Sequence, residues 1–274
     1  MTEISHPTAP LLPATPTVLV TGGGVRLGAE ICRAFAQAGW RVLCQYRNSA
    51  AAARALCQAL QDQGHDALAI EGDLASEAGR RELMARAAQV AGPLSCLVNN
   101  ASAFEPDSGT GFDAELARAQ LEVNLIAPLS LARELCAGLP ADGGLDASVI
   151  HILDQKVYNL NPDYFSYTVT KLALERAVAL QAQALAPRVR VCGVAPGLMY
   201  LSGPQTPDNF ERASRVNLLK RATDPADVAR ACLFLAQTRS VTGTTLCVDS
   251  GQHLVPLARD VMFALDENPS PETP

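Results

Sequence analysis

Apolar positions along the chain follow two different periods. Short runs of apolar and β-branched residues alternate with longer segments in which apolar residues recur every three or four positions. The short runs predict strands at residues 18–20, 41–46, 67–70, 96–98, 148–153, 189–194 and 245–248. The longer segments predict helices at residues 27–38, 50–63, 76–90, 114–137, 164–185 and 225–236. Pro128 predicts a bend in the fourth helix, and Asp224 is expected to cap the last one.

This alternation of strand and helix predicts an α/β fold. We expect a doubly wound, seven-stranded parallel sheet, covered by helices on both faces, in a Rossmann-type single domain. The domain is expected to span residues 17–258, after a flexible leader at 1–16 and before a C-terminal tail at 259–274. The one long irregular stretch, 197–209, follows the sixth strand. We interpret the region of about 197–216 as a lid loop over the site.

Charge and composition exclude several classes of function. The 274 residues carry a net charge of −6 with a pI near 5.3, which argues against nucleic acid as the main partner. No stretch approaches the roughly 20 apolar residues of a membrane helix. The eight cysteines include no Cys-x-x-Cys pair, and the four histidines have no metal-ligand spacing. We therefore expect buried free thiols, a reducing and thus cytoplasmic location, no membrane partner and no metal.

A glycine-rich turn follows the first predicted strand. Residues 21–28 read Thr-Gly-Gly-Gly-Val-Arg-Leu-Gly and lead directly into a helix. Glycines such as Gly22 and Gly28 let the backbone turn sharply and approach a phosphate closely. A turn in this place is where a dinucleotide pyrophosphate binds, although an ordinary tight turn would read the same way.

The end of the second strand indicates which nicotinamide cofactor is bound. Sites for NAD place an acid there to bind the ribose hydroxyls, whereas this chain has Tyr46, Arg47, Asn48 and Ser49. An arginine, an amide and a hydroxyl beside a helix N-terminus suit a 2′-phosphate, and Arg26 in the glycine turn adds a second cation. The residues therefore predict NADPH, the alternative being a solvated surface arginine.

Two further strand ends carry small polar or acidic residues. Asp73 and Leu74 follow the third strand, where the aspartate could accept a hydrogen bond from the adenine amine or cap the next helix. Asn99, Asn100 and Ala101 follow the fourth strand. These residues would border the cofactor ribose, or they form a simple turn.

The candidate chemistry lies at Asp154, Tyr167 and Lys171. The spacing Tyr-x-x-x-Lys places a phenol and an ammonium one helical turn apart on the same face. Because a nearby ammonium stabilises phenolate, we expect the tyrosine pKa to fall and the phenol to act as an acid near neutral pH.

In order along the chain, these segments resemble the successive motifs of the short-chain dehydrogenases/reductases. The resemblance spans about residues 17–254 and is carried by the glycine turn, Asp73, the Asn-Asn-Ala run, Asn124, the Tyr-x-x-x-Lys pair and Pro196-Gly197. It implies that Gly22, Leu27, Gly28, Leu74, Asn100, Ala101, Pro196 and Gly197 contribute to cofactor binding. Asn124 resembles the family residue that anchors a water relay towards the catalytic lysine.

Four departures resemble one branch of that family, the pteridine reductases and bacterial dihydromonapterin reductases. Arg26 occupies the position where the family usually has the third glycine of the turn. Asp154 replaces the usual serine, 13 residues before Tyr167. Ser102 and Phe104 follow the Asn-Asn-Ala run, and a leucine replaces the usual threonine after Pro196-Gly197. The resemblance implies that Arg26 contacts cofactor phosphate and substrate, that Ser102 contacts cofactor and pterin, and that Phe104 stacks on the pterin opposite the nicotinamide.

The expected reaction is the NADPH-dependent reduction of a pterin ring C=N bond, in a dihydropterin, dihydromonapterin or dihydrofolate. Asp154 suits this substrate because pterins present amidine and ring N–H donors to a carboxylate, whereas a ketone has none. Lys171 would also hold the nicotinamide ribose. The alternatives are an NADPH-dependent carbonyl or 3-oxoacyl-thioester reductase, and a non-catalytic NADPH-binding sensor. The resemblance also implies a homotetramer in which the helices 114–137 and 164–185 pack across one interface.

Overall fold

The computed structural model describes residues 15–141, 146–203 and 205–265. All but two residues of the leader expected at 1–16 lie outside these ranges, as does the end of the C-terminal tail from residue 266. Within them the chain forms one seven-stranded sheet in which every pairing is parallel. The strands are β1 (Thr17–Val20), β2 (Arg41–Tyr46), β3 (Ala67–Glu71), β4 (Cys96–Asn99), β5 (Ala147–Ile152), β6 (Val189–Pro196) and β7 (Thr245–Val248).

The strand order β3-β2-β1-β4-β5-β6-β7 is doubly wound. The chain runs outward from β1 to β3, then returns to pair β4 with β1 and runs outward the other way. This confirms the fold class predicted from the sequence. The reversal opens a crevice at the carboxyl ends of β1 and β4, which is where ligands bind in sheets of this kind.

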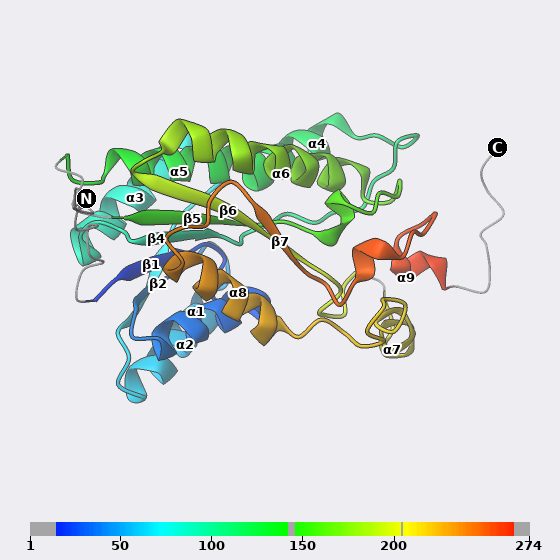
Figure 1. The fold of residues 1–274 in the computed structure, drawn as a ribbon, viewed down its shortest axis with the longest axis horizontal. Helices are drawn as coiled ribbons and strands as arrows, with labels where there is room; N and C mark the ends of the chain where they lie inside the picture. The colour runs from blue at the N-terminus through cyan, green and yellow to red at the C-terminus, as the bar shows by residue number, and fades with distance from the viewer. Residues whose placement is uncertain (1–14, 142–145, 204, 266–274) are drawn as a thin grey trace, which may run out of the picture.

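Helices cover both faces of the sheet (Figure 1). In the view of Figure 1, α1, α2 and α8 lie below the sheet, and α3 to α6 lie above it. The helices are α1 (Arg26–Gln37), α2 (Ala50–Asp62), α3 (Glu77–Ala91), α4 (Ala114–Leu121), α5 (Ala127–Ala137), α6 (Phe165–Leu185), α7 (Pro207–Ala213), α8 (Pro225–Gln237) and α9 (Val261–Ala264), with short segments η1 (Glu122–Ile126), η2 (Gln155–Val157) and η3 (Gln252–Leu254).

Two apolar cores, one on each face of the sheet, explain why the strands read as continuous apolar runs. Side chains alternate across a strand, so Val18 and Val20 pack against the α1, α2 and α8 side while Leu19 packs against the α3, α5 and α6 side. All three side chains are fully buried. The eight cysteines are free thiols, and all except the half-buried Cys136 and Cys247 are buried.

Three expectations about the irregular regions need correction. The single helix expected at 114–137 is α4 and α5 joined by the π-helical segment η1, with Pro128 near the junction, in the first turn of α5. The expected lid contains α7, and residues 100–113 form a second long irregular stretch. Residues 259–265, assigned to the tail, include α9, which lies beside α7 (Figure 1). The cap expected at Asp224 is confirmed, since its carboxylate accepts from Ala226 N.

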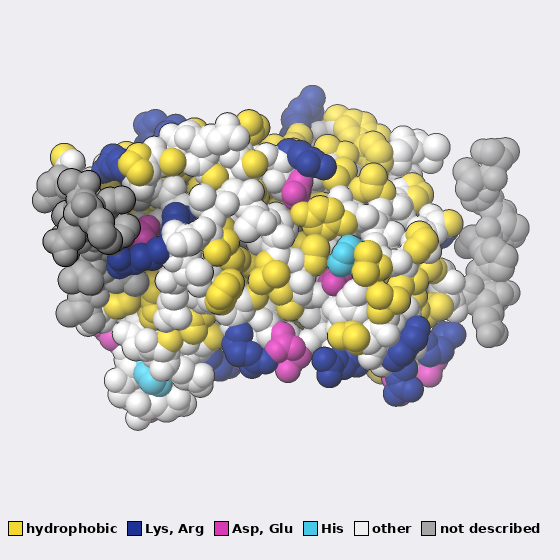
Figure 2. Space-filling model, in the orientation of Figure 1, with side chains coloured by type: hydrophobic (Ala, Val, Ile, Leu, Met, Phe, Trp, Pro, Cys, Tyr) yellow, Lys and Arg dark blue, Asp and Glu magenta, His cyan; other side chains and the backbone are white. Residues whose placement is uncertain are grey.

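The face shown in Figure 2 carries positive and negative side chains interspersed, with apolar side chains between them. Among the described helices, none combines the length and the apolar character needed to cross a membrane.

A buried histidine joins the centre of the sheet to α6. His151 on β5 is fully buried, with Nδ1 3.2 Å from Asn99 Nδ2 and Nε2 2.8 Å from Gln181 Oε1. The amide of Asn99 is a donor, so Nδ1 accepts and the Nε2–H donates to Gln181. Burial disfavours the charged ring and lowers the pKa of His151 to about 4.

This depressed pKa predicts a specific loss of stability in acid. Between pH 6.5 and about 4 the unfolded chain binds a proton that the folded chain does not, so the free energy of unfolding decreases as pH falls through that window. The loss attributable to His151 is about 3 kcal/mol, from about 1.4 kcal/mol per pKa unit. Urea unfolding at pH 7 and pH 4.5 captures most of this loss.

His151→Gln is the matched variant because glutamine keeps polar atoms at this site but does not titrate. The variant should lose less stability than the parent chain over this window. Glu77 does not affect this comparison. Arg133, Arg80 and Ser130 hold its pKa at about 2, so its contribution to the free energy of unfolding is lost only between pH 4.5 and about 2. Equal losses in both proteins would show that His151 does not titrate as described.

Candidate active site

A cavity of about 470 Å³ opens at the carboxyl ends of the central strands, at the reversal of the strand order. Most of the residues selected from the sequence line it, although they come from segments far apart in the chain. These are Gly22, Arg26, Leu27, Gly28, Asn100, Ala101, Ser102, Phe104, Asp154, Tyr167, Lys171, Pro196 and Gly197. Tyr46, Arg47, Asn48, Ser49, Asp73, Leu74 and Asn124 lie outside its lining.

The glycine turn forms a cradle between β1 and α1. Gly22 has φ +60°, and a Cβ on Gly28 would collide with the carbonyl oxygen of Gly22, so larger side chains would push the turn apart. The first turn of α1 contains no acidic residue, which leaves its N-terminus favourable for an anion. Gln45, which the sequence did not reveal, supports the turn: its Oε1 accepts from Gly22 N at 2.8 Å and its Nε2 donates to Gly72 O at 2.7 Å.

Arg26 lies between this turn and the segment that follows Gly197. Its φ is +50°, in the region that favours glycine, which explains why glycine is common at this position of the motif. Its Nη2 donates to Leu201 O at 3.2 Å, and its guanidinium lies 4.9 Å from the centre of the Tyr200 ring. The arginine therefore lines the cavity and contacts the segment that follows Gly197.

The group expected to bind the 2′-phosphate lies on the surface next to the cavity. Tyr46 is buried at the end of β2, whereas the side chain of Arg47 is 57% exposed and its Nη1 lies 4.0 Å from Asp73 Oδ1. Ser49 is the N-cap of α2 and makes no side-chain cap hydrogen bond. An exposed guanidinium beside a helix N-terminus is available to an anionic ligand.

Asp73 does not cap the next helix. The N-cap of α3 is Ser76, whose Oγ accepts from Gly79 N at 3.1 Å. Asp73 instead accepts from Ala75 N at 3.1 Å and from Ser76 Oγ at 3.3 Å, which folds the loop after β3. The helix-cap alternative raised by the sequence is therefore wrong, and the adenine contact stays a prediction.

The ends of β1 and β4 are tied together below the cavity. Thr21 Oγ1 accepts from Asn100 N at 2.9 Å and from Ala101 N at 3.0 Å. Asn100 Nδ2 donates to Thr21 O at 3.0 Å and to Gly22 O at 3.2 Å. Asn99 is directed away, towards His151 in the core. The Asn-Asn-Ala run thus fixes the glycine turn to the neighbouring strand.

Asp154 and Tyr167 form a hydrogen-bonded pair in the cavity. Tyr167 Oη donates to Asp154 Oδ2 at 2.9 Å, and Lys171 Nζ donates to Ile152 O at 2.8 Å while lying 5.7 Å from the centre of the Tyr167 ring. Asp154 follows β5 and begins η2, and the other two residues lie one turn apart near the start of α6.

The electrostatics of this group contradict one expectation. Burial, together with the Asp154 carboxylate, raises the pKa of Tyr167 well above 10, rather than lowering it. Burial also raises the pKa of Asp154 and lowers that of Lys171 to about 8. The expected fall of the tyrosine pKa is wrong because desolvation and a directly bonded carboxylate outweigh the more distant ammonium.

Phe104 is part of an aromatic stack. Its ring lies 4.1 Å from that of Tyr164 at an angle of 19°, and 4.7 Å from that of Tyr167 at 86°. Tyr164, which the sequence analysis did not single out, is buried and has φ +54° immediately before α6. One face of Phe104 is therefore occupied within the protein, so a ligand ring would have to use the other.

Asn124 holds the loop that carries Ser102 and Phe104. It is fully buried in η1, where its Oδ1 accepts from Ala103 N at 2.7 Å and from Ser102 Oγ at 3.2 Å. Its Nδ2 donates to Ala103 O at 2.8 Å and to Thr170 Oγ1 at 3.1 Å. These contacts make Asn124 a positioning residue, outside the cavity lining, and the water relay towards Lys171 stays a prediction.

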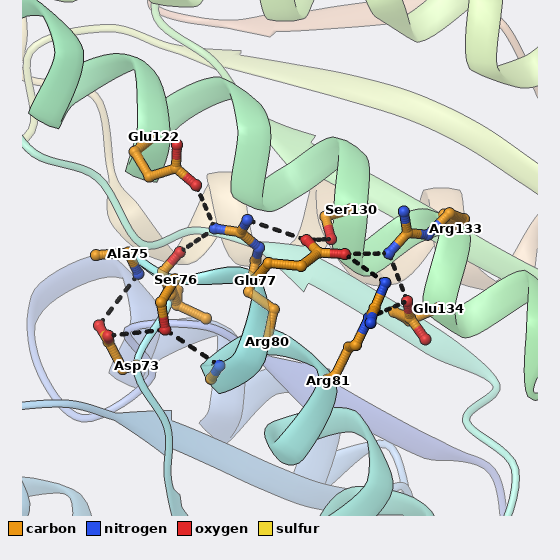
Figure 3. Close-up of polar contacts among 12 residues, drawn as sticks. Asp73, Ala75, Ser76, Glu77, Arg80, Arg81, Glu122, Ser130, Arg133 and Glu134 are labelled. Carbon is orange, nitrogen blue, oxygen red and sulfur yellow. Dashed lines mark hydrogen bonds and ion pairs between the residues drawn. The ribbon is translucent and has the colours of Figure 1, made fainter.

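A charged network links η1 to the loop after β3 (Figure 3). Arg80, buried on α3, donates from Nη1 to Leu74 O at 2.7 Å and to Glu122 Oε1 at 2.6 Å. Its Nη2 lies 3.1 Å from Glu77 Oε2, and Glu77 also accepts from Arg133 at 2.7 Å. Arg80 therefore braces the segment that carries Asn124 against the one that carries Asp73.

A second charged pair lies in the cavity wall and was not found from the sequence. Lys156 Nζ is 2.9 Å from Asp260 Oδ2, and both residues line the cavity together with Val261 and Met262 of α9. No local pattern connects residues 104 positions apart. Across the described ranges, no group of three or more histidine, cysteine, aspartate or glutamate side chains could hold a metal ion.

Comparison with known proteins places these features in context. Residues 24–253 match the protein-family profile described as enoyl-(acyl carrier protein) reductase. The crystal structure of FolM alternative dihydrofolate reductase 1 from Brucella canis, complexed with NADP, is 37% identical, with a TM-score of 0.84 over 89% of this chain and 96% of that one.

Two similar sequences differ in their named activities. Dihydromonapterin reductase of Citrobacter koseri is 28% identical over 86% of this chain and 96% of its own length. A putative ketoacyl reductase of the granaticin polyketide synthase from Streptomyces violaceoruber is 30% identical over 89% and 98%.

Proposed function

The chain belongs to the short-chain dehydrogenase/reductase family, and from that membership we propose that it is an NADPH-dependent reductase of a pterin ring C=N bond. The substrate would be a dihydropterin, dihydromonapterin or dihydrofolate, and the product its tetrahydro form. The observation that carries the proposal is the hydrogen-bonded pair of Asp154 and Tyr167 inside the cavity. Relatives named dihydromonapterin reductase and alternative dihydrofolate reductase support it.

The residues present suit NADPH. The cradle made by Gly22 and Gly28 would hold the pyrophosphate. The N-terminus of α1 lies beside it and has no acidic residue in its first turn. Arg47, Asn48 and Ser49 would bind the 2′-phosphate. The remaining cofactor contacts would follow the cavity lining and its edge: Arg26, Leu27, Tyr46, Asp73, Leu74, Asn100, Ala101, Ser102, Tyr167, Lys171, Pro196 and Gly197. When bound, the cofactor supplies the hydride.

Asp154 and Tyr167 would supply the matching proton. Reduction of C=N adds hydride to carbon and requires a proton on the adjacent nitrogen. At a pH below the raised pKa of Asp154 the pair holds two protons, one on each residue, and can give one away while the other remains shared between them. Above that pKa the donation would leave two adjacent anions in a buried site, which is costly. The rate of reduction should therefore fall as pH rises through the pKa of Asp154.

Other cavity residues would bind and orient the heterocycle. Phe104 in the cavity lining offers an aromatic ring for contact with a pterin, and Ser102 and Arg26 offer a hydroxyl and a cation in the same lining. Asp154 can accept from the amidine and ring N–H donors of a pterin. A simple ketone lacks these donors, which is why the carboxylate favours the pterin.

A substrate panel tests the proposal. With NADPH, the chain should reduce dihydropterins or dihydrofolate and should leave simple ketones and 3-oxoacyl thioesters unreduced, as followed by loss of NADPH absorbance. Asp154→Ser should lower kcat/KM for the pterin by about 10²-fold, because it removes the carboxyl that shares the proton with Tyr167 and accepts from the pterin N–H donors. Turnover of ketones with no turnover of any pterin would overturn the proposal.

Two alternatives predict different outcomes of the same panel. A carbonyl or 3-oxoacyl-thioester reductase is favoured by the similarity to the putative ketoacyl reductase, and it predicts that the ketones turn over. A non-catalytic NADPH-binding sensor predicts tight NADPH binding without oxidation by any substrate. The sensor is the weaker alternative because the cavity retains both Tyr167 and Lys171.

We also propose a homotetramer located in the cytoplasm. Apolar side chains of Phe165, Val169 and Leu180 are exposed on α6, and that of Ile126 is exposed on η1. These elements belong to the helices expected to pack across one interface, and burial of apolar surface would stabilise it.

A further inference from the structure

The C-terminal segment closes one wall of the cavity with a buried ion pair. The side chain of Lys156 is only 3% exposed and that of Asp260 is 16% exposed, and their charged atoms are 2.9 Å apart. Both residues line the cavity that contains Asp154 and Tyr167. Since a buried charge needs a partner, each residue holds the other in place.

Lys156 is held by three acceptors, so it is not free to bind a ligand. Its Nζ donates to Asn161 Oδ1 at 2.8 Å and to Asp163 O at 2.9 Å, in addition to Asp260. An ammonium has three donors, and all three are used. Its backbone N also donates to Asp154 Oδ1 at 2.9 Å, so the pair and Asp154 belong to one connected structure.

We propose that Lys156 and Asp260 are positioning residues that set the pH at which Asp154 and Tyr167 release their proton, and that the C-terminal segment is thereby part of the reducing centre. The proposal rests on the proton-donor role given above to that pair. It follows from the position of one positive and one negative charge, both buried, beside a carboxyl and a phenol in the same cavity wall.

The two charges act in opposite directions. The Lys156 ammonium favours the Asp154 carboxylate and lowers its pKa, whereas the Asp260 carboxylate opposes it and raises the pKa of both Asp154 and Tyr167. The Lys156 charge has the larger of the two effects on the pKa of Asp154. Lys171 of α6 is a further cation in the cavity lining, and its charge interacts with that of Asp154.

Charged neighbours also surround Asp260 itself. Asp163 Oδ2 accepts from Asp260 N at 2.7 Å, and Arg259 Nη2 lies 2.8 Å from Asp163 Oδ1. The buried Tyr164 ring lies 5.5 Å from Lys156 Nζ. Since Arg259 is 55% exposed, solvent screens its charge far more than that of Lys156.

The test removes one charge at a time. Asp260→Asn leaves the ammonium uncompensated, so the descending limb of the pH profile of kcat/KM should move to lower pH by about one unit. Lys156→Gln leaves the carboxylate uncompensated, so the limb should move to higher pH by about the same amount. The double variant has neither charge, and its profile should lie between those of the single variants.

Loss of packing alone would not produce shifts of opposite sign. Arg259→Gln is the matched control, since it removes an exposed charge next to Asp260 and should leave the limb within about 0.3 units. Shifts in the same direction, or no shift in either single variant, would overturn the proposal. If Lys156→Gln does not fold, Asp260→Asn still decides, because Asp260 is the more exposed of the two and its expected shift has a fixed sign.

A measurement without turnover separates this proposal from the proposed function. The ¹³Cγ resonance of Asp154, assigned by its absence in Asp154→Asn, reports the carboxyl pKa directly in the full chain. Asp260→Asn should lower that pKa and Lys156→Gln should raise it. If these shifts occur and no pterin is reduced, only the proposed function fails; if pterins are reduced and the resonance does not move, only the present proposal fails.

Discussion

Tyr167→Phe is expected to lower kcat for the pterin by about 10³-fold, within the range that loss of a general acid produces. The substitution removes only the phenolic oxygen, which donates to Asp154 Oδ2 at 2.9 Å. Asp154 then loses the partner that shares its remaining proton, so donation leaves a buried carboxylate without the hydrogen bond from the phenol. Stopped-flow single turnover with NADPH and a dihydropterin measures the loss in the chemical step.

The variant should retain NADPH binding, measured by quenching of protein fluorescence, because the cradle at Gly22 and Gly28 is unchanged. Tyr158→Phe is the control: Tyr158 is 41% exposed and its hydroxyl bonds to Glu175 Oε1 at 3.0 Å, outside the cavity lining. It should keep nearly full activity. If Tyr167→Phe retained a kcat close to that of the parent chain, the tyrosine would not belong to the proton donor.

The strands and most helices could be predicted from the sequence because their signals are local. Parallel strands buried on both faces read as continuous apolar runs, and Val18, Leu19 and Val20 show why, since neighbouring residues enter different cores. Most of the predicted site residues gather at one cavity for a similar reason. The carboxyl ends of parallel strands meet at one edge of the sheet, so residues that follow successive strands become neighbours.

Features that depend on distant segments could not be predicted in this way. The sequence around Asn124 predicts an ordinary helix. The structure has a π-helical segment there, and its residues bond to distant ones: Asn124 to Ala103, and Glu122 to Arg80. In the sequence Asp260 lies in a segment expected to be a tail, and only the folded structure shows that it pairs with Lys156.

The sign of the tyrosine pKa shift also required the folded structure. The Tyr-x-x-x-Lys spacing identifies a cation one turn away, but it gives neither the burial of Tyr167 nor the hydrogen bond to Asp154. Both of these raise the pKa of Tyr167. Sequence spacing therefore identified the correct partners and gave the wrong direction.

Arg47→Asp is expected to raise the KM for NADPH by about 10²-fold and that for NADH by no more than about threefold. The guanidinium is the side chain at the end of β2 best placed for a 2′-phosphate, since it is 57% exposed and only loosely paired, at 4.0 Å, with Asp73. Substitution removes a charge-assisted interaction and puts a carboxylate where the phosphate would lie. NADH carries no 2′-phosphate, and an acid at this position suits its ribose hydroxyls.

Steady-state kinetics with both cofactors, at one fixed pterin concentration, measures the ratio of the two effects. Arg86→Asp is the matched control, because Arg86 is an exposed arginine of α3 paired with Glu82, and the same change of charge there should leave both KM values nearly unchanged. A general effect of net charge would weaken both cofactors alike in both variants. Only a phosphate contact predicts a loss confined to Arg47→Asp and to NADPH, so parallel losses for the two cofactors would show that the 2′-phosphate is bound elsewhere.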